Sequence, residues 1–116
     1  METTPEFGFD TYQIVTRTTA IYPQAMRRTS SAITYCVIGA VGEVGELANK
    51  YKKTLRDGWT SELKEGMADE IGDALWYLAR AADEMGLSLA DIATNNIDKL
   101  TSRRMRKQLH GSGDDR

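Results

Sequence analysis

The sequence predicts an all-α fold, a bundle of about four helices that oligomerisation completes. Apolar residues recur at intervals of three and four along two long segments, which is the period of one helix face. No segment of useful length alternates apolar and polar residues as a half-buried strand does. With 116 residues, 41% hydrophobic and 28% charged, the chain is expected to form one soluble domain over 1–116, with an irregular N-terminus at 1–9 and a loop-like tail at 108–116.

The first half of the chain is expected to hold two helices. One runs over about 10–21 and ends before Pro23, which cannot continue it. A longer helix runs over about 32–55, with Ser30 or Ser31 as its N-cap. The apolar positions of this longer helix share one face: Ile33, Val37, Val41, Val44, Ala48, Tyr51 and Leu55.

Two further helices are expected in the second half. Thr60 or Ser61 can cap a third helix, and Gly86 suits the position just after its last turn. Ser88 with Asp91 resembles a capping box that opens a fourth helix. The apolar face of the third helix consists of Leu63, Met67, Ile71, Ala74, Leu78, Ala82 and Met85.

Composition limits the classes of function. The net charge is −2, but a basic segment near the C-terminus suits the phosphates of a nucleotide or of nucleic acid. No stretch approaches membrane-spanning length and no secretory leader is recognisable, so a cytoplasmic location is expected. The single cysteine, Cys36, is expected to be a small buried residue. The basic segment consists of Lys99, Arg103, Arg104, Arg106 and Lys107.

The long helices carry apolar residues over wide arcs. A bundle of this size buries limited apolar surface by itself. Part of this surface is therefore expected to meet a second copy, which favours a homo-oligomer, a dimer or a tetramer, over a monomer.

Two pairs of carboxylates are the most informative feature. Glu43 with Glu46, and Glu70 with Asp73, are each spaced three residues apart, so each pair lies on one helix face. A single pair of this kind is common on solvated helices, but here two pairs stand on otherwise apolar helices. Four such carboxylates on facing helices repel one another and need a counter-charge. Mg²⁺ or Mn²⁺ is the usual solution.

The types of ligand atom that the sequence offers limit which metal can bind. A di-iron site in a helical bundle needs histidine ligands, and the only histidine, His110, stands in the tail. An all-oxygen site instead suits Mg²⁺, which binds carboxylates together with the phosphates of a substrate. Magnesium, phosphates and a water nucleophile together define hydrolysis of a phosphoryl group.

With these carboxylate pairs, the chain resembles the MazG-like nucleotide pyrophosphohydrolases of the all-α NTP pyrophosphatase superfamily. The resemblance runs from about Asp10 to Arg116. It implies a Mg²⁺-dependent hydrolase acting on phosphoric anhydrides, which cleaves (d)NTP between the α and β phosphates to (d)NMP and pyrophosphate. The matching segments are 42–47 (GEVGEL), 69–78 (DEIGDALWYL), 96–100 (NIDKL) with Arg103, and the tail 111–116 (GSGDDR).

The resemblance also implies roles for individual residues. Glu43, Glu46, Glu70 and Asp73 are the catalytic carboxylates that hold the metal, and one glutamate of the first pair also orients or deprotonates the attacking water. The substrate side is implied to include Tyr77, Asn96, Lys99, Arg103, Asp114 and Arg116.

Several side chains keep two interpretations. Lys50 and Lys53 can reach phosphates or pair with nearby acids, and pairing is favoured. Tyr77 can contact the nucleotide or pack as a core aromatic. Trp76 is expected to pack, and Trp59 is undecided.

A second class of function is a non-catalytic helical module that contacts nucleic acid or nucleotide through its basic fourth helix. The acidic net charge, and the absence of aromatic residues among the basic ones, argue against it. The expected partner is therefore a nucleoside triphosphate, and neither nucleic acid nor membrane. The sequence leaves open the base and sugar, the biological task and the number of metal ions.

Overall fold

The computed structural model describes the backbone of residues 6–110 and the side chains of residues 6–107. The predicted all-α bundle is confirmed, and the described residues include no strand. The first helix ends earlier than predicted, and the fourth continues through 108–110, which were expected to be loop-like. The elements are α1 (Phe9–Thr16), the 3₁₀ turn η1 (Arg17–Thr19), α2 (Ser30–Asp57), α3 (Ser61–Glu84) and α4 (Leu89–His110).

The ends of the helices follow local hydrogen bonding. The Thr29 hydroxyl accepts from the backbone N–H of Ala32 at 3.1 Å, and so caps α2 one residue earlier than predicted. The Thr60 hydroxyl accepts from the backbone N–H of Leu63 at 3.0 Å, which caps α3 as predicted. Gly86 follows the end of α3 with a φ of 71°, a left-handed conformation that glycine adopts without steric cost.

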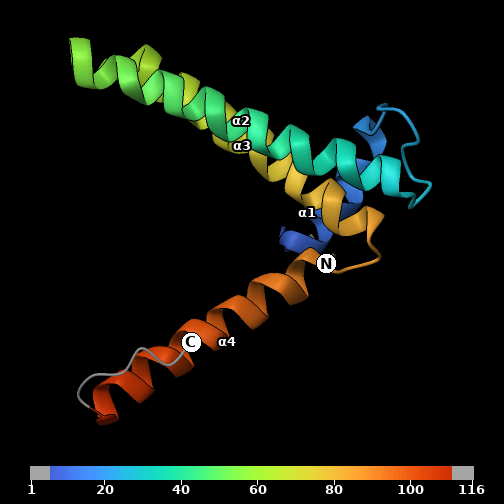
Figure 1. Ribbon diagram of the computed structural model, residues 1–116. Helices are drawn as coiled ribbons and strands as arrows, with labels where there is room; N and C mark the ends of the chain where they lie inside the picture. Colours follow the sequence, from blue (N-terminus) through green and yellow to red (C-terminus); the bar gives the residue numbers. More distant parts are fainter. Residues whose placement is uncertain (1–5, 111–116) are drawn as a thin grey trace, which may run out of the picture.

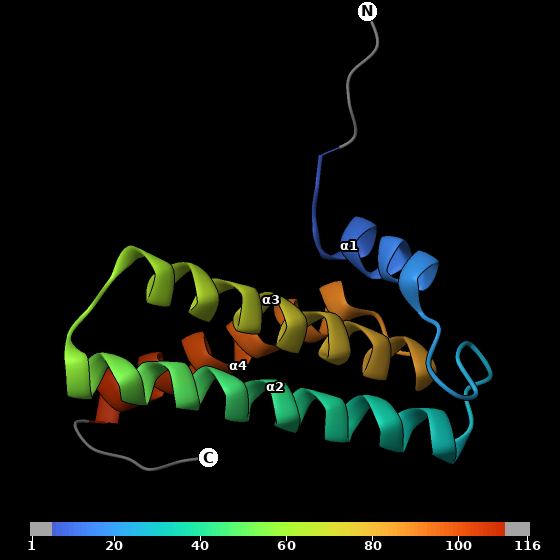
Figure 2. The same ribbon diagram turned by 90° about the horizontal axis from the view of Figure 1, so that it is seen from above.

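The helices α2 and α3 form an antiparallel pair, packed side by side (Figure 1). The short α1 lies against α3 on the side away from α2 (Figure 2). The fourth helix, α4, leaves the bundle near the end of α3 and runs away from the pair (Figure 1). The radius of gyration is 18.0 Å, against about 13 Å for a compact domain of this length. The single chain is therefore an open arrangement and not a closed bundle.

The stripe of large apolar residues on α2 is not the face that packs against α3. The side that meets α3 carries small residues, and Ala32, Cys36 and Ala40 are buried there. Val41 is 68% exposed and Leu55 is 71% exposed. Hydrophobic periodicity locates apolar residues, but it does not say which of two neighbouring stripes a partner helix covers. Small side chains let the two helices approach closely, so the stripe of large residues stays at the surface.

Helix α2 also meets the length and composition of a membrane span, with 28 residues and a mean hydropathy of 1.2 over 18 of them. The prediction that no stretch approaches spanning length is therefore wrong. A helix that packs against another protein surface meets the same criterion. Glu43 and Glu46 lie near the middle of α2, where ionised groups are unfavourable in lipid. Length and composition alone thus do not assign α2 to a membrane.

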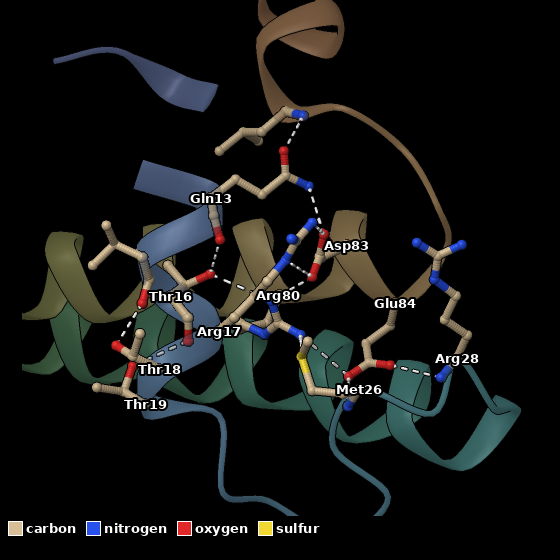
Figure 3. A network of polar contacts seen from close by, with 12 residues as sticks. Gln13, Thr16, Arg17, Thr18, Thr19, Met26, Arg28, Arg80, Asp83 and Glu84 are labelled. Atoms are coloured by element: carbon tan, nitrogen blue, oxygen red, sulfur yellow. Dashed lines mark hydrogen bonds and ion pairs between the residues drawn. The ribbon is translucent and has the colours of Figure 1, made fainter. Parts of the chain in front are cut away.

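A buried network of polar side chains joins the end of α3 to α1 (Figure 3). Arg80 is fully buried and donates to Asp83 at 2.7 Å and to the Tyr22 hydroxyl at 3.1 Å. Its second ion pair is with Glu84, at 3.4 Å. Arg17 donates to both oxygens of Asp83 at 2.9 Å. We call Arg80, Asp83 and Glu84 the buried ion network, and its charges all have partners within the chain.

The same network fixes the loop before α2. Gln24, Met26 and Arg28 have positive φ angles of 65°, 69° and 55°, each of which costs about 1 kcal/mol or more in a residue other than glycine. The Glu84 carboxylate offsets this strain by accepting from the backbone N–H groups of Met26 at 2.8 Å and Arg28 at 2.9 Å. It also accepts from the Tyr22 hydroxyl. These bonds therefore hold the loop in one conformation up to the start of α2.

Candidate metal centre

The packing of α2 on α3 brings three of the four predicted carboxylates together. Glu43 comes from α2, and Glu70 and Asp73 come from one face of α3. One oxygen atom from each lies within 4.8 Å of the other two. Glu46, about one turn after Glu43, is exposed and is not among the residues within that distance. We call Glu43, Glu70 and Asp73 the acidic cluster.

The acidic cluster carries more negative charge than its surroundings neutralise. A hydrogen bond with Glu70 is the largest cause that raises the pKa of Glu43 to about 7, followed by desolvation and the negative charges around it. The same hydrogen bond is the largest cause that lowers the pKa of Glu70, and Lys50 lowers it further. Near neutral pH, Glu43 and Glu70 therefore share a proton, as carboxylates at close range do.

This donor set fits a hard divalent cation. Carboxylate oxygens are the ligands that Mg²⁺ and Mn²⁺ prefer, and three of them converge here. A cation among them would replace the shared proton as the balancing charge. Mg²⁺ held by few protein ligands keeps further positions for water and for phosphate oxygens, which suits a site that must also bind a substrate.

Lys50 contacts the acidic cluster directly. Its Nζ lies 2.7 Å from Glu70 Oε1 and 3.3 Å from the carbonyl oxygen of Gly66. The prediction that Lys50 pairs with a nearby acid is therefore confirmed. Lys53, on the same helix, is exposed.

A cavity of about 600 Å³ opens about one helical turn from the acidic cluster. The rings of Tyr35 and Tyr77 line it, with their centroids 6.4 Å apart. Gly39 lies beneath the Tyr77 ring, and a Cβ atom at this position would overlap the ring. The cavity is also lined by the hydroxyl side chains of Ser30, Ser31 and Thr34.

Tyr77 was predicted from the sequence as a site residue, and Tyr35 was not. Tyr35, Gly39 and Glu43 are spaced four residues apart along α2, so they follow one another along a single helix face. Extending the acidic face of α2 by two turns towards its N-terminus would have found the cavity. The spacing that indicates Tyr35 is thus present in the sequence, but it can be used only once the face of α2 that meets α3 is known.

The two tryptophans lie in different places. Trp76 donates from Nε1 to the Thr19 hydroxyl at 2.8 Å and its ring lies 6.1 Å from that of Tyr22, so it packs as predicted. Trp59 lies beside Tyr51, with ring centroids 6.2 Å apart, close to the turn that joins α2 to α3. Neither tryptophan lines the cavity beside the acidic cluster.

The predicted phosphate-binding residues lie on α4, apart from the acidic cluster. Asn96 and Lys99 are exposed and Arg103 is half-buried. Because α4 runs away from the α2–α3 pair (Figure 1), a single chain does not bring these side chains to the carboxylates. Asp114 and Arg116 lie outside the described residues.

The fold and the site define a class of protein: an all-α chain in which two packed helices present carboxylates suited to a divalent cation, beside an aromatic cavity. The model of the MazG nucleotide pyrophosphohydrolase domain matches residues 29–106. This range includes the acidic cluster, the cavity and most of α4. The chain belongs to the MazG nucleotide pyrophosphohydrolase family.

A similar protein is known from a bacteriophage. The Gene 37 protein of Mycobacterium phage L5 is 42% identical over 111 residues, which cover 92% of this chain and 97% of that protein. Its name states no activity. No solved structure matches the chain.

Proposed function

We propose that this protein is a Mg²⁺-dependent hydrolase that cleaves (d)NTP between the α and β phosphates and releases (d)NMP and pyrophosphate. The observation that carries the proposal is the acidic cluster, whose three carboxylates converge within 4.8 Å in a chain of the MazG family. Mg²⁺, or Mn²⁺ in its place, would neutralise the phosphate oxygens and supply a nucleophilic water. We expect this reaction in the cytoplasm, without a membrane or nucleic-acid partner.

In this proposal three of the carboxylates are ligands of the cation, and the fourth is the general base that accepts a proton from the attacking water. Glu43, Glu70 and Asp73 hold the cation, because their oxygens converge. Glu46 lies about one turn along the same helix, exposed and outside the cluster. A carboxylate that is not itself neutralised by the cation keeps its basicity, so we assign to Glu46 the proton of the attacking water.

The cavity beside the acidic cluster is the proposed place of the nucleobase. Its volume of about 600 Å³ is within the usual range for small-molecule sites. The rings of Tyr35 and Tyr77 offer apolar faces to a flat ring. The hydroxyl groups of Ser30, Ser31 and Thr34 offer both donors and acceptors to the polar edge of a base. The choice among bases therefore depends on how these hydroxyl groups orient.

A second copy of the chain would complete the site. The stripe of large apolar residues on α2 is uncovered, and on α4 Ile97 is 62% exposed and Leu100 is 49% exposed. Contiguous exposed apolar surface of this kind is typical of an interface. We infer that a dimer or tetramer covers these faces, and that α4 of one copy presents Asn96, Lys99 and Arg103 to the phosphates held by another.

Product analysis tests the proposal. A panel of dNTPs and NTPs, with and without Mg²⁺, should give equal amounts of monophosphate and pyrophosphate only when the metal is present. Light scattering on the same sample should give the mass of two or four chains. Release of inorganic phosphate instead of pyrophosphate would contradict the cleavage position. Nucleic-acid binding without any turnover would support the non-catalytic module.

A further inference from the structure

Lys50 is held at two points beside the acidic cluster. Its ammonium group bonds to Glu70 Oε1 at 2.7 Å and to the carbonyl oxygen of Gly66 at 3.3 Å. The two acceptors are one turn apart on α3, whereas Lys50 comes from α2. The Lys50 side chain is 29% exposed and that of Glu70 is 13% exposed, so this ion pair differs from the mobile pairs of a solvated surface.

The glycine at position 66 leaves the space that the Lys50 side chain occupies. A Cβ atom at position 66 would lie 3.3 Å from both Cδ and Nζ of Lys50, closer than ordinary van der Waals contact. Glycine in a helix interior is less favourable than alanine, so its presence at this point of α3 calls for a packing reason. Because Gly66 has no side chain, the Lys50 side chain can lie directly over the backbone of α3 at this point and reach Glu70.

The Glu70 carboxylate is thereby held between a cation on α2 and the other carboxylates of the cluster. Carboxylates that bind a metal are oriented by hydrogen bonds from groups behind them, and losing such a group weakens metal binding. We propose that Lys50 is a positioning residue of this kind, which holds Glu70 in place as a ligand for the divalent cation. The proposal rests on the metal site of the proposed function but not on its reaction.

Two other roles for Lys50 predict different changes in metal affinity when its charge is removed. A cation that merely competes with the metal for Glu70 would, when removed, leave the metal more tightly bound. A simple surface ion pair would leave metal binding unchanged. Metal affinity without nucleotide therefore separates the three roles.

The experiment measures Mn²⁺ binding to the full chain by electron paramagnetic resonance, in the absence of nucleotide. Lys50→Met should weaken Mn²⁺ binding by about 10- to 100-fold, the usual effect of losing an orienting partner. Lys53→Met removes the same charge from an exposed position on the same helix and should bind Mn²⁺ like the wild type. Equal or tighter binding by Lys50→Met would overturn the proposal.

Gly66→Ala separates positioning from stability. Alanine is the better helix former, so this variant should keep the helix content of the wild type. Its Cβ should displace the Lys50 side chain and weaken Mn²⁺ binding, by less than Lys50→Met does. In the Lys50→Met background the same change should leave Mn²⁺ binding unaltered, since no lysine is left to displace. A Gly66→Ala variant with unchanged Mn²⁺ affinity counts against the proposal.

The two proposals can fail separately. If Lys50→Met loses Mn²⁺ affinity while the wild type releases no pyrophosphate, the positioning role stands and the proposed reaction is wrong. If the wild type is active while Lys50→Met binds Mn²⁺ normally, the reaction stands and the positioning role is wrong. A wild type that binds no Mn²⁺ overturns the positioning role outright.

Discussion

Two charged clusters lie on the same helix, α3, and they differ in how their charges are balanced. In the buried ion network, Arg80 bonds to both Asp83 and Glu84, and all three side chains are buried. In the acidic cluster, three carboxylates of Glu43, Glu70 and Asp73 face one another. A buried cluster with every charge paired is strongly destabilised when one partner is removed, because an uncompensated charge is left in the interior. A partly exposed cluster with surplus charge and a perturbed pKa is typical of a functional site.

The comparison predicts that each cluster governs a different measurement. Changes in the buried ion network should alter the free energy of unfolding. Changes in the acidic cluster should alter turnover and metal binding while leaving the fold intact. A variant of the acidic cluster that unfolded the chain, or a variant of the buried ion network that lost turnover without losing stability, would break this division.

The largest expected effect is the loss of stability in Arg80→Met. Removing the guanidinium leaves Asp83 and Glu84 buried with less compensation, and the free energy of unfolding should fall by about 3–5 kcal/mol. Urea denaturation measures this loss. Arg56→Met is the matched control, because Arg56 pairs with Asp57 at the surface with 69% of its side chain exposed, and it should leave the free energy of unfolding close to that of the wild type.

Asp73→Asn should show the opposite pattern. Losing one carboxylate of the acidic cluster should lower kcat by about 100-fold or more, given what electrostatic stabilisation contributes to phosphoryl transfer. Helix content should stay that of the wild type, because the side chain is exposed. Circular dichroism and pyrophosphate release give the two values. Near-normal turnover at saturating Mg²⁺ would remove the acidic cluster from the mechanism.

The smallest effect is a pH dependence of the metal-free protein. Hydrogen bonding to Glu70 and desolvation raise the pKa of Glu43 from 4.5 to about 7. Between these two values the folded chain keeps a proton that the unfolded chain has released, so the free energy of unfolding falls as pH rises through this window. The lowered pKa of Glu70 acts below 4.5, outside the window. The Tm should therefore decline from about pH 5 to about pH 8.

Glu43→Gln sharpens this test. The variant should lose this part of the decline and melt above the metal-free wild type at the upper end of the range. Mg²⁺ should raise the Tm of the wild type in a concentration-dependent way, because it binds only the folded state. Identical pH profiles of the two metal-free proteins would show that Glu43 is not coupled to Glu70.

The elements of the fold could be predicted from the sequence more fully than their packing could. Caps and period located α2, α3 and α4, because these signals are local. The face of α2 that packs on α3 was not predicted, because Val41 and Leu55 satisfy the helical period without being covered. The two predicted pairs of carboxylates came from local spacing as well, but only the packing of α2 on α3 separates Glu46 from the other three.

The buried ion network lay beyond sequence reasoning for a different reason. Arg80 and Glu84 read as ordinary charged residues of a solvated helix, and ionisable side chains are seldom fully buried. Their partners are distant in the chain, since Tyr22 and Glu84 are 62 residues apart. Nothing in the local sequence around α3 indicates such a partner.

The contact between Gly39 and Tyr77 couples the substitutions that these two positions can accept. Any side chain at position 39 would displace the aromatic ring that walls the cavity. A descendant chain can enlarge residue 39 only if residue 77 shrinks, and a smaller residue at 77 leaves a void over a bare helix backbone. At these two positions the cavity can therefore change shape only by paired substitution, although the two residues are 38 positions apart in the chain.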